Sequence, residues 1–182
     1  MPRVIITGGP GAGKTALLRQ LAALGFATVE ESARAVIAER LAIGLPPRPA
    51  PIEFAREILR RDVEKYERGA DATGWIFFDR GVIEALAMVN EVKPIPAAEL
   101  AATLNAHAVH PLVFVLPPWP EIYTTDAERD HDFEHAVAVH ARICSWYARC
   151  GYRLHEVPRL SVAERAQHVL RTLNEAPSLG QA

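Results

Sequence analysis

The segment from Gly8 to Thr15 constrains this chain more than any other part of its sequence. An apolar run, Arg3–Thr7, precedes it, and leucines at helical spacing follow it over Thr15–Leu24. The segment fits the pattern G-x-x-x-x-G-K-[ST], and its eight residues are Gly8, Gly9, Pro10, Gly11, Ala12, Gly13, Lys14 and Thr15. A strand, a glycine-rich turn and a helix in this order predict a loop whose backbone N–H groups surround a phosphate.

The residue types in this loop fit a nucleoside triphosphate. Glycines let the backbone curl inward, Lys14 can reach the β- and γ-phosphates as a point charge, and the Thr15 hydroxyl is a hard ligand for Mg²⁺. A dinucleotide-binding G-x-G-x-x-G motif fails, because counting from Gly9 and Gly11 the sixth position is Lys14. No [NT]-K-x-D motif for reading guanine occurs in the chain. We predict that the loop binds ATP with Mg²⁺, although the sequence does not decide the preference between ATP and GTP.

Five short apolar runs alternate with helical patterns along the 182 residues. The expected strands are Arg3–Thr7, Ala27–Glu30, Trp75–Asp79, Leu112–Leu116 and Tyr152–Val157. The expected helices are Thr15–Leu24, Ser32–Ile43, Ile52–Arg68, Val82–Asn90, Ala97–His107, Phe133–Arg149 and Ser161–Leu173. This alternation predicts an α/β fold, with a five-stranded parallel sheet covered by helices on both faces. We expect one domain over residues 1–174, with a small lid at about 117–133, and a loose tail over 175–182.

Charge and composition exclude several classes of protein. The 22 acidic and 20 basic residues give a net charge of −2, which argues against an ATPase that acts on nucleic acid. The longest stretch without charged residues, Leu100–Pro120, contains prolines and histidines, so we expect no membrane span. The amino-terminal residues show no signal-peptide pattern, and there are only two cysteines. We predict a cytoplasmic protein and leave its oligomeric state open.

Charged residues follow the second and third expected strands, at the sheet edge where parallel strands place a site. Asp79 is a candidate Mg²⁺ ligand, and Arg80 stands where motor-type ATPases usually carry a water-activating glutamate, so it can hold a phosphate instead. Glu31, or the adjacent Glu30, is a candidate base for a substrate hydroxyl. Arg34 could pair with Glu31 or clamp an anion. Each has a plainer interpretation: a helix N-cap for Asp79, a first-turn acid for Glu31 and a surface cation for Arg80.

Two more arginines are candidates for the nucleotide. Arg129, in the expected lid, could close over the triphosphate and neutralise charge in the transition state, or belong to a solvated charged face. Arg159 follows the last strand and could stack on the nucleotide base. Trp119 and Tyr123 could pack at the base of the lid or stack on a ligand.

A zinc site is a competing interpretation of the segment after the lid. His131-Asp132-Phe133-Glu134-His135 fits the H-x-x-E-H pattern, and His140 lies nearby. Zinc catalysis needs a third placed ligand, and it would leave the phosphate loop without a role. We expect these side chains to form the exposed face of a helix.

The combination of motifs resembles the AAA-domain type 28 family of ATP-binding proteins. The segments that carry the resemblance are TGGPGAGKT, E-x-A-R at Glu31–Arg34, FFDRG at Asp79, LPPWPEIYTTDAERDHDFEHA from Leu116, and VPR-x-SVAER. The resemblance covers about Arg3 to Leu173 and implies a fold closer to small-molecule kinases, including nicotinamide-riboside kinase, than to ring-forming motors. In nucleoside kinases a glutamate after the second strand acts as base, and an Asp-Arg pair follows the third. Glu31, Asp79 and Arg80 match those positions.

We therefore predict a P-loop phosphotransferase of the nucleoside/nucleotide-kinase type. It would transfer the γ-phosphoryl group of ATP·Mg²⁺ to an unidentified small acceptor in a cleft between Ser32–Ile43 and Ile52–Arg68. The predicted catalytic residues are Lys14, Glu31, Asp79, Arg80 and Arg129, with Gly8–Thr15 and Arg159 on the nucleotide and Thr15 and Asp79 on the metal. The alternative is a nucleotide-dependent regulatory switch that hydrolyses ATP slowly.

Overall fold

The computed structural model describes residues 3–68, 74–123 and 132–175. All the expected strands and helices are present, with ends shifted by at most two residues. In chain order they are β1 (Arg3–Gly8), α1 (Lys14–Ala23), β2 (Ala27–Val29), α2 (Ser32–Ala42), α3 (Pro51–Arg68), β3 (Ile76–Asp79), α4 (Val82–Val92), α5 (Ala97–Ala106), β4 (Leu112–Leu116), the 3₁₀ helix η2 (Pro120–Ile122), α6 (Phe133–Arg149), β5 (Arg153–Glu156) and α7 (Val162–Glu175). Within the described ranges no helix is both long and apolar enough to cross a membrane.

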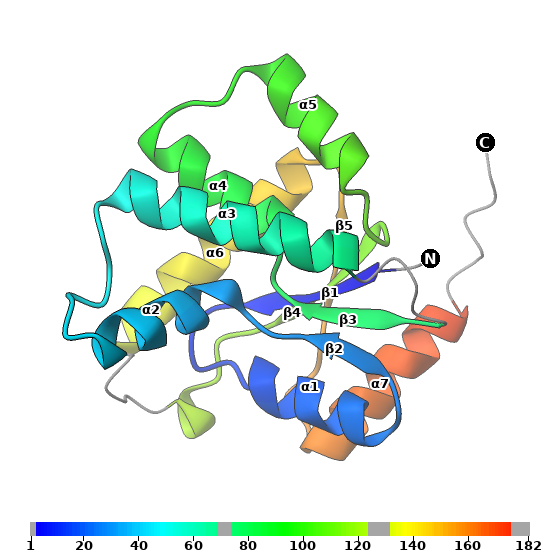
Figure 1. Ribbon diagram of the computed structural model, residues 1–182. Coiled ribbons are helices and arrows are strands. Elements are labelled where there is room, and N and C mark those ends of the chain that lie inside the picture. Colours follow the sequence, from blue (N-terminus) through cyan, green and yellow to red (C-terminus); the bar gives the residue numbers. More distant parts are fainter. Residues whose placement is uncertain (1–2, 69–73, 124–131, 176–182) are drawn as a thin grey trace.

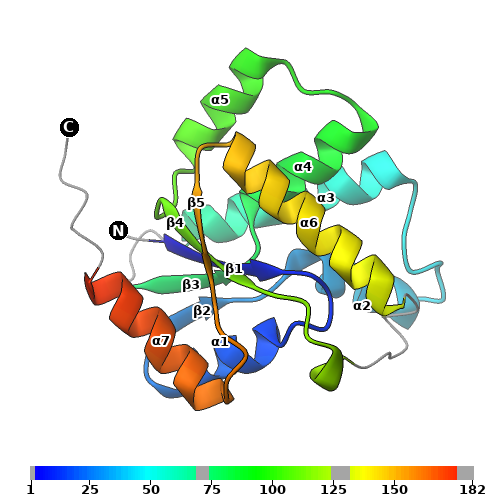
Figure 2. The same ribbon diagram turned by 180° about the vertical axis from the view of Figure 1, so that it is seen from behind.

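The five strands form one parallel sheet, as predicted. Their order in the sheet is β2-β3-β1-β4-β5. Helices α1 and α7 cover one face, and α3, α4 and α6 cover the other (Figures 1 and 2). Alternate residues of β1 face the two layers: Val4 and Ile6 join the core beneath α1 and α7, whereas Ile5 joins the core beneath α4 and α6. Burial on both faces explains why β1 is an almost continuous β-branched run.

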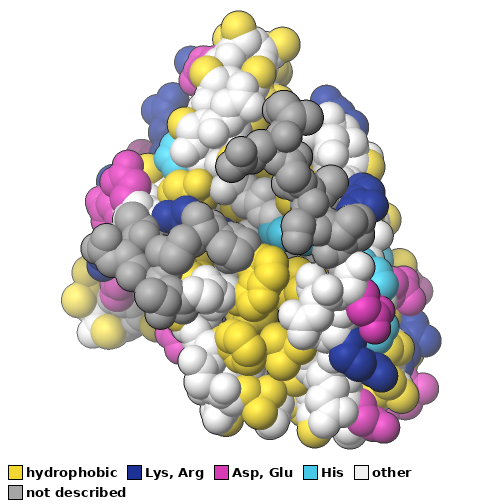
Figure 3. All heavy atoms as spheres, turned by 90° about the vertical axis from the view of Figure 1, so that its right-hand side faces the viewer, with side chains coloured by type: hydrophobic (Ala, Val, Ile, Leu, Met, Phe, Trp, Pro, Cys, Tyr) yellow, Lys and Arg dark blue, Asp and Glu magenta, His cyan; other side chains and the backbone are white. Residues whose placement is uncertain are grey.

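The order of the strands decides where a site can form. β1 lies between β3 and β4, with Ile6 paired to Asp79 on one side and to Phe114 on the other. The loops that follow these three strands therefore meet at one edge of the sheet. The opposite edge, where the strands begin, shows apolar side chains in its lower middle and charged ones along its margin (Figure 3).

The packing of α2 against α3 shapes one side of the expected cleft. Val36 and Ile37 of α2 share a buried cluster with Phe54 and Ile58 of α3 and with Ala85 of α4. The cavity described below is lined by residues of both helices, as expected, and also by residues of α4 and α6.

Side chains cap two of the helices as their sequences indicate. The Asp132 carboxylate accepts a hydrogen bond from the His135 backbone N–H at 2.8 Å and so begins α6. At the start of α7, Glu164 accepts from the Ser161 hydroxyl at 2.6 Å and from its backbone N–H at 3.0 Å. This confirms the predicted capping box.

A pair of histidines joins β5 to α7. The Nε2 atoms of His155 and His168 lie 2.8 Å apart, and the two rings are stacked with centroids 5.0 Å apart. Such a bond needs one nitrogen with a proton and one without. Burial lowers the pKa of His168 below its ordinary value, and the neighbouring His155 and Arg171 lower it further.

We expect this pair to make stability depend on pH. Because the folded state binds a proton on His168 less readily than the unfolded state, its contribution is complete above pH 6.5 and declines as the pH falls below that value. Urea unfolding at about pH 8 and about pH 5 should show wild type losing stability relative to His168→Gln on acidification. The control is His107→Gln, a change at a partly buried histidine at the end of α5 that leaves the pair intact, and its pH dependence should follow wild type. Identical pH dependence in wild type and His168→Gln would contradict this role.

Candidate active site

The phosphate loop connects the central strand to α1, as predicted. Gly11 and Gly13 have φ angles of 74° and 84°, in the left-handed region that favours glycine. A Cβ on Gly8 would lie 2.5 Å from the carbonyl oxygen of Leu116 on β4, so this position also needs glycine. The side chain of Tyr123 packs directly against Gly11. The loop therefore packs against β4 and the segment that follows it.

The Lys14 side chain is buried inside the loop. Its Nζ donates to the carbonyl oxygens of Gly8 at 3.1 Å and Gly9 at 3.0 Å. Burial, and then the positive charge of Arg80, lower the pKa of Lys14 to about 8. The ammonium group is thus held at the loop by two carbonyl groups, a position from which it can exchange them for phosphate oxygens.

Arg80 adopts an unusual backbone conformation directly after β3. Its φ of 65° lies in the left-handed region, which costs a non-glycine residue on the order of 1 kcal/mol or more. The conformation is held by contacts to β1: the Arg80 N–H donates to Ile6 at 3.1 Å, and Nη2 donates to Gly8 at 3.0 Å. Strain of this kind, fixed by surrounding contacts, is typical of functional sites.

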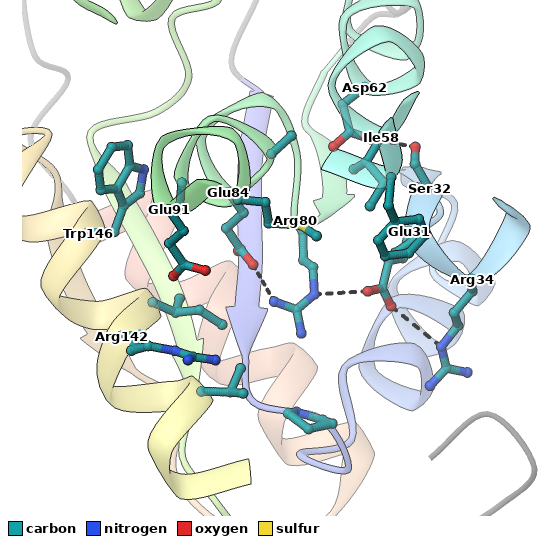
Figure 4. A pocket seen from close by; sticks show the side chains of 18 of the residues that line it. Glu31, Ser32, Arg34, Ile58, Asp62, Arg80, Glu84, Glu91, Arg142 and Trp146 are labelled. Carbon is teal, nitrogen blue, oxygen red and sulfur yellow. Dashed lines mark hydrogen bonds and ion pairs between the residues drawn. The ribbon is translucent and has the colours of Figure 1, made fainter. Parts of the chain in front are cut away.

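Three charged side chains gather around this arginine (Figure 4). We call the four residues together the Arg80 cluster: Glu31, Arg34, Arg80 and Glu84. Arg80 forms ion pairs with Glu84 and, through Nε at 3.1 Å, with Glu31. Arg34 pairs with the other oxygen of Glu31 at 3.4 Å, which confirms the predicted pairing of these two residues. Although burial disfavours its charge, the carboxylates Glu84, Glu31 and Asp79 raise the pKa of Arg80.

Glu84 is a site residue that sequence reasoning missed. Its buried carboxylate accepts hydrogen bonds from the Thr7 hydroxyl of β1, from Arg80, and from the Tyr147 hydroxyl of α6 at 3.1 Å. The available signal was an acid four residues after Arg80 in the otherwise apolar start of a helix. Buried acids need donors, and these three come from three different elements.

Asp79 is buried at the end of β3, beside the loop. Burial first, and the negative charge of Glu31 among other effects, raise its pKa to about 6, against the opposing charge of Lys14. Its Oδ1 atom is buried and has no hydrogen-bond partner among the described residues. The N-cap interpretation is wrong, because Gly81 occupies the N-cap position of α4 and no side chain caps that helix.

The two candidate bases differ in their surroundings. Glu31 lines the cavity and is ion-paired, whereas Glu30 is exposed and contributes its backbone carbonyl to Lys65. The structure therefore brings Glu31, and not Glu30, together with Lys14 and Arg80.

A cavity of about 600 Å³ extends from the phosphate loop between α2, α3, α4 and α6. Lys14 and the Arg80 cluster lie at one end, and apolar side chains, including Phe54, Met88 and Trp146, line the walls. The Trp146 indole is fixed by a 2.8 Å hydrogen bond from Nε1 to the carbonyl of Ile83. The volume and mixed lining suit a small molecule with polar and apolar parts.

The other predicted nucleotide residues lie elsewhere. Arg159 is exposed, donates to the Pro118 carbonyl at 2.7 Å, and is outside the cavity lining. Its role on the base stays a prediction. Trp119 instead faces Arg165, whose Cζ lies 5.4 Å from the indole centre and whose side chain is buried beside Gly13. Arg129 and most of the expected lid lie outside the described residues, as does the tail beyond residue 175.

The zinc interpretation finds no third ligand nearby. Among residues 3–68, 74–123 and 132–175, no group of three or more His, Cys, Asp or Glu side chains could hold a metal ion by itself. Asp132 caps α6, and His135 lines the cavity. His131 lies outside the described residues.

Comparison with known proteins identifies the family. The sequence matches the AAA_28 family, described as an AAA domain, over residues 3–165. The chain belongs to this family. A search of curated proteins found no match for this AAA_28 protein.

Solved structures of kinases share the fold of this AAA_28 protein. NadR in complex with NR matches with a TM-score of 0.69 and 19% identity, covering 100% of this chain and 53% of that one. Deoxyadenosine kinase from M. mycoides with products bound matches with a TM-score of 0.63 and 16% identity, covering 94% of this chain and 98% of that one. Shikimate kinase from Acinetobacter baumannii in complex with shikimate matches with a TM-score of 0.57 and 16% identity, covering 99% of this chain and 96% of that one. The predicted P-loop kinase fold is thus confirmed.

We expect Glu84 to be a main contributor to the stability of the site. Glu84→Ala would leave buried Arg80 with one carboxylate fewer and remove the shared acceptor of Thr7 and Tyr147, which should cost about 3–5 kcal/mol. Tyr147→Phe removes one donor and should cost about 1 kcal/mol. Both losses can be measured by urea unfolding, with the exposed Glu91→Ala on the same helix as control. An unfolding midpoint for Glu84→Ala equal to that of the control would show that the buried carboxylate is dispensable.

Proposed function

We propose that this AAA_28 protein is a kinase that transfers the γ-phosphoryl group of ATP to a hydroxyl group of a small acceptor. The observation that carries the proposal is the Arg80 cluster. It holds a guanidinium and the carboxylate of Glu31 at the end of the cavity that also contains Lys14. A phosphoryl transfer needs cations for the transferring group and a base for the attacking hydroxyl, and this end of the cavity offers both.

The residues present fit Mg²⁺·ATP. The glycine-rich loop is held open by its contacts with Leu116 and Tyr123, and Lys14 lies within it. The buried Oδ1 of Asp79 lacks a partner among the described residues, which suits a carboxylate that would hold a hard cation together with Thr15. When bound, Mg²⁺·ATP supplies the phosphoryl group and neutralises part of its charge.

The chain's own residues would act in the following way. Glu31 accepts the proton of the acceptor hydroxyl while that oxygen bonds to the γ-phosphorus and the bond to ADP breaks, with the electron pair leaving on ADP. Arg80 is fixed by Glu84, so its Nη2 can exchange the Gly8 carbonyl for a phosphoryl oxygen. Arg34 keeps the Glu31 carboxylate in place. A second guanidinium from the lid, Arg129, stays a prediction.

We expect ADP release from ATP·Mg²⁺ to depend on an acceptor and on two residues. Lys14→Ala should abolish it, because the phosphates lose their buried cation. Glu31→Gln should lower kcat by about 10²- to 10⁴-fold with little change in the KM for ATP, because only the base is lost. Glu30→Gln is the matched control, since this neighbouring acid is exposed, and it should behave as wild type.

The acceptor panel contains nucleosides, nucleotides and vitamin ribosides. Slow ADP release that no acceptor changes would contradict a kinase and favour a nucleotide-dependent switch. Equal losses in Glu30→Gln and Glu31→Gln would overturn the assignment of the base while leaving the kinase in place.

A further inference from the structure

The cavity contains a buried acid that the proposed reaction does not use. Asp62 of α3 is 8% exposed and lines the cavity. Its Oδ1 accepts a hydrogen bond from the hydroxyl of Ser32, the residue after Glu31. Neither residue belongs to a recognised motif, so the sequence alone did not single them out.

The surroundings of Asp62 keep it short of donors. Burial raises the pKa of Asp62 to about 6, although the Ser32 hydroxyl and the charge of Lys65 partly oppose this. The Ser32 hydroxyl is the one side-chain donor that the described residues direct to this carboxylate. A carboxylate has about four lone-pair positions, so a ligand in the cavity can satisfy those that the protein leaves.

Asp62 and Glu31 belong to the same wall of the cavity. Figure 4 shows Asp62, Ser32 and Glu31 one after another along that wall, with Arg80 beside Glu31 and Arg34 below it. The two arginines are already paired with Glu31. At the Asp62 end, this wall therefore offers carboxylate oxygens to a ligand, and they suit hydroxyl donors better than a phosphate placed beside them.

The cations that could receive an acidic acceptor lie on other elements. Arg142 and Arg149 belong to α6 and are exposed, as is Arg48 in the segment between α2 and α3. Figure 4 shows Arg142 across the cavity from Glu31. Between these two sides the lining contains apolar side chains, including Phe54, Met88 and Trp146, together with the acids Glu84 and Glu91. A flat or apolar group fits against the apolar part of this lining.

We propose that Asp62, positioned by Ser32, binds a second hydroxyl of an uncharged polyol acceptor, whose first hydroxyl is presented to Glu31. The acceptor class is then a sugar-like diol linked to an apolar or flat group, without a phosphate beside the hydroxyls. This inference rests on the proposed kinase function and adds the specificity of its acceptor side.

The test uses the full chain with ATP·Mg²⁺ and measures ADP release for wild type and Asp62→Asn. Asparagine keeps the size of the side chain and an oxygen for Ser32 but removes the charge. The acceptors are ribonucleosides, their 2′-, 3′- and 5′-deoxy analogues, and their 5′-monophosphates. We expect Asp62→Asn to raise the KM of the accepted nucleoside about 10- to 100-fold, with kcat changed less than about twofold. The deoxy analogue that lacks the second hydroxyl should have the same KM in both proteins.

Two more variants guard against a purely structural effect. Glu67→Gln, an acid-to-amide change at an exposed position on α3 outside the cavity lining, should behave as wild type. Ser32→Ala keeps the Asp62 charge but removes the hydroxyl that holds it, so it should raise the same KM by a smaller factor. If Asp62→Asn does not fold, Ser32→Ala tests the role of Asp62 by itself: it should raise the KM of the accepted nucleoside but not that of the deoxy analogue that lacks the second hydroxyl.

The outcomes separate the inference from the proposed function. An equal rise in KM for a nucleoside and its deoxy analogue, or a preference for monophosphate acceptors, overturns the role of Asp62 while the kinase stands. If wild type binds ATP but phosphorylates no acceptor, the proposed function fails and this inference fails with it.

Discussion

One buried guanidinium holds the candidate site together. Arg80 is fixed at its backbone by β1, donates to the end of the phosphate loop, and pairs with carboxylates from α2 and α4. A buried charge without partners is costly, so each partner must be in place for this arrangement to persist. Because β3 pairs directly with β1, with Asp79 beside Ile6, the residue after β3 reaches the loop after β1 without a longer connection.

The sequence predicts well which residues meet at the phosphate loop, because the signals there are local. The loop from Gly8 to Thr15 is one continuous motif between a strand and a helix, and the Glu31–Arg34 pair lies within a single helical turn. Asp79 and Arg80 end a strand whose apolar run is clear. For these residues, the spacing along the chain already determines the neighbours in space.

The acceptor end could not be predicted in the same way. Asp62 lies in the charged run Arg60-Arg61-Asp62-Val63-Glu64-Lys65, which indicates a solvated helix face. Its burial arises only when α2 packs against α3, and its hydrogen bond comes from Ser32, 30 residues away. The same holds for Glu84, because two of its three donors lie 77 and 63 residues away. The expected cleft between α2 and α3 was incomplete, because residues of α4 and α6 also line the cavity.

The solved structures with this fold carry different small molecules. Kinases whose structures carry shikimate, NR or deoxynucleotide products share the fold at 19% identity or less. A shared fold with such different bound molecules means that acceptor choice depends on individual side chains and not on the architecture. In this chain the cavity side chains outside the loop motif come mainly from α2, α3, α4 and α6.

The cations of the site already have partners within the protein, and a ligand must compete with them. Arg80 is matched by two carboxylates, and Lys14 is held by two carbonyl oxygens, before any ligand arrives. A small inorganic anion offers too few contacts to replace these partners, whereas a long polyanion can replace several of them at once. Competition from these internal partners therefore favours ligands with several anionic oxygens over single small anions.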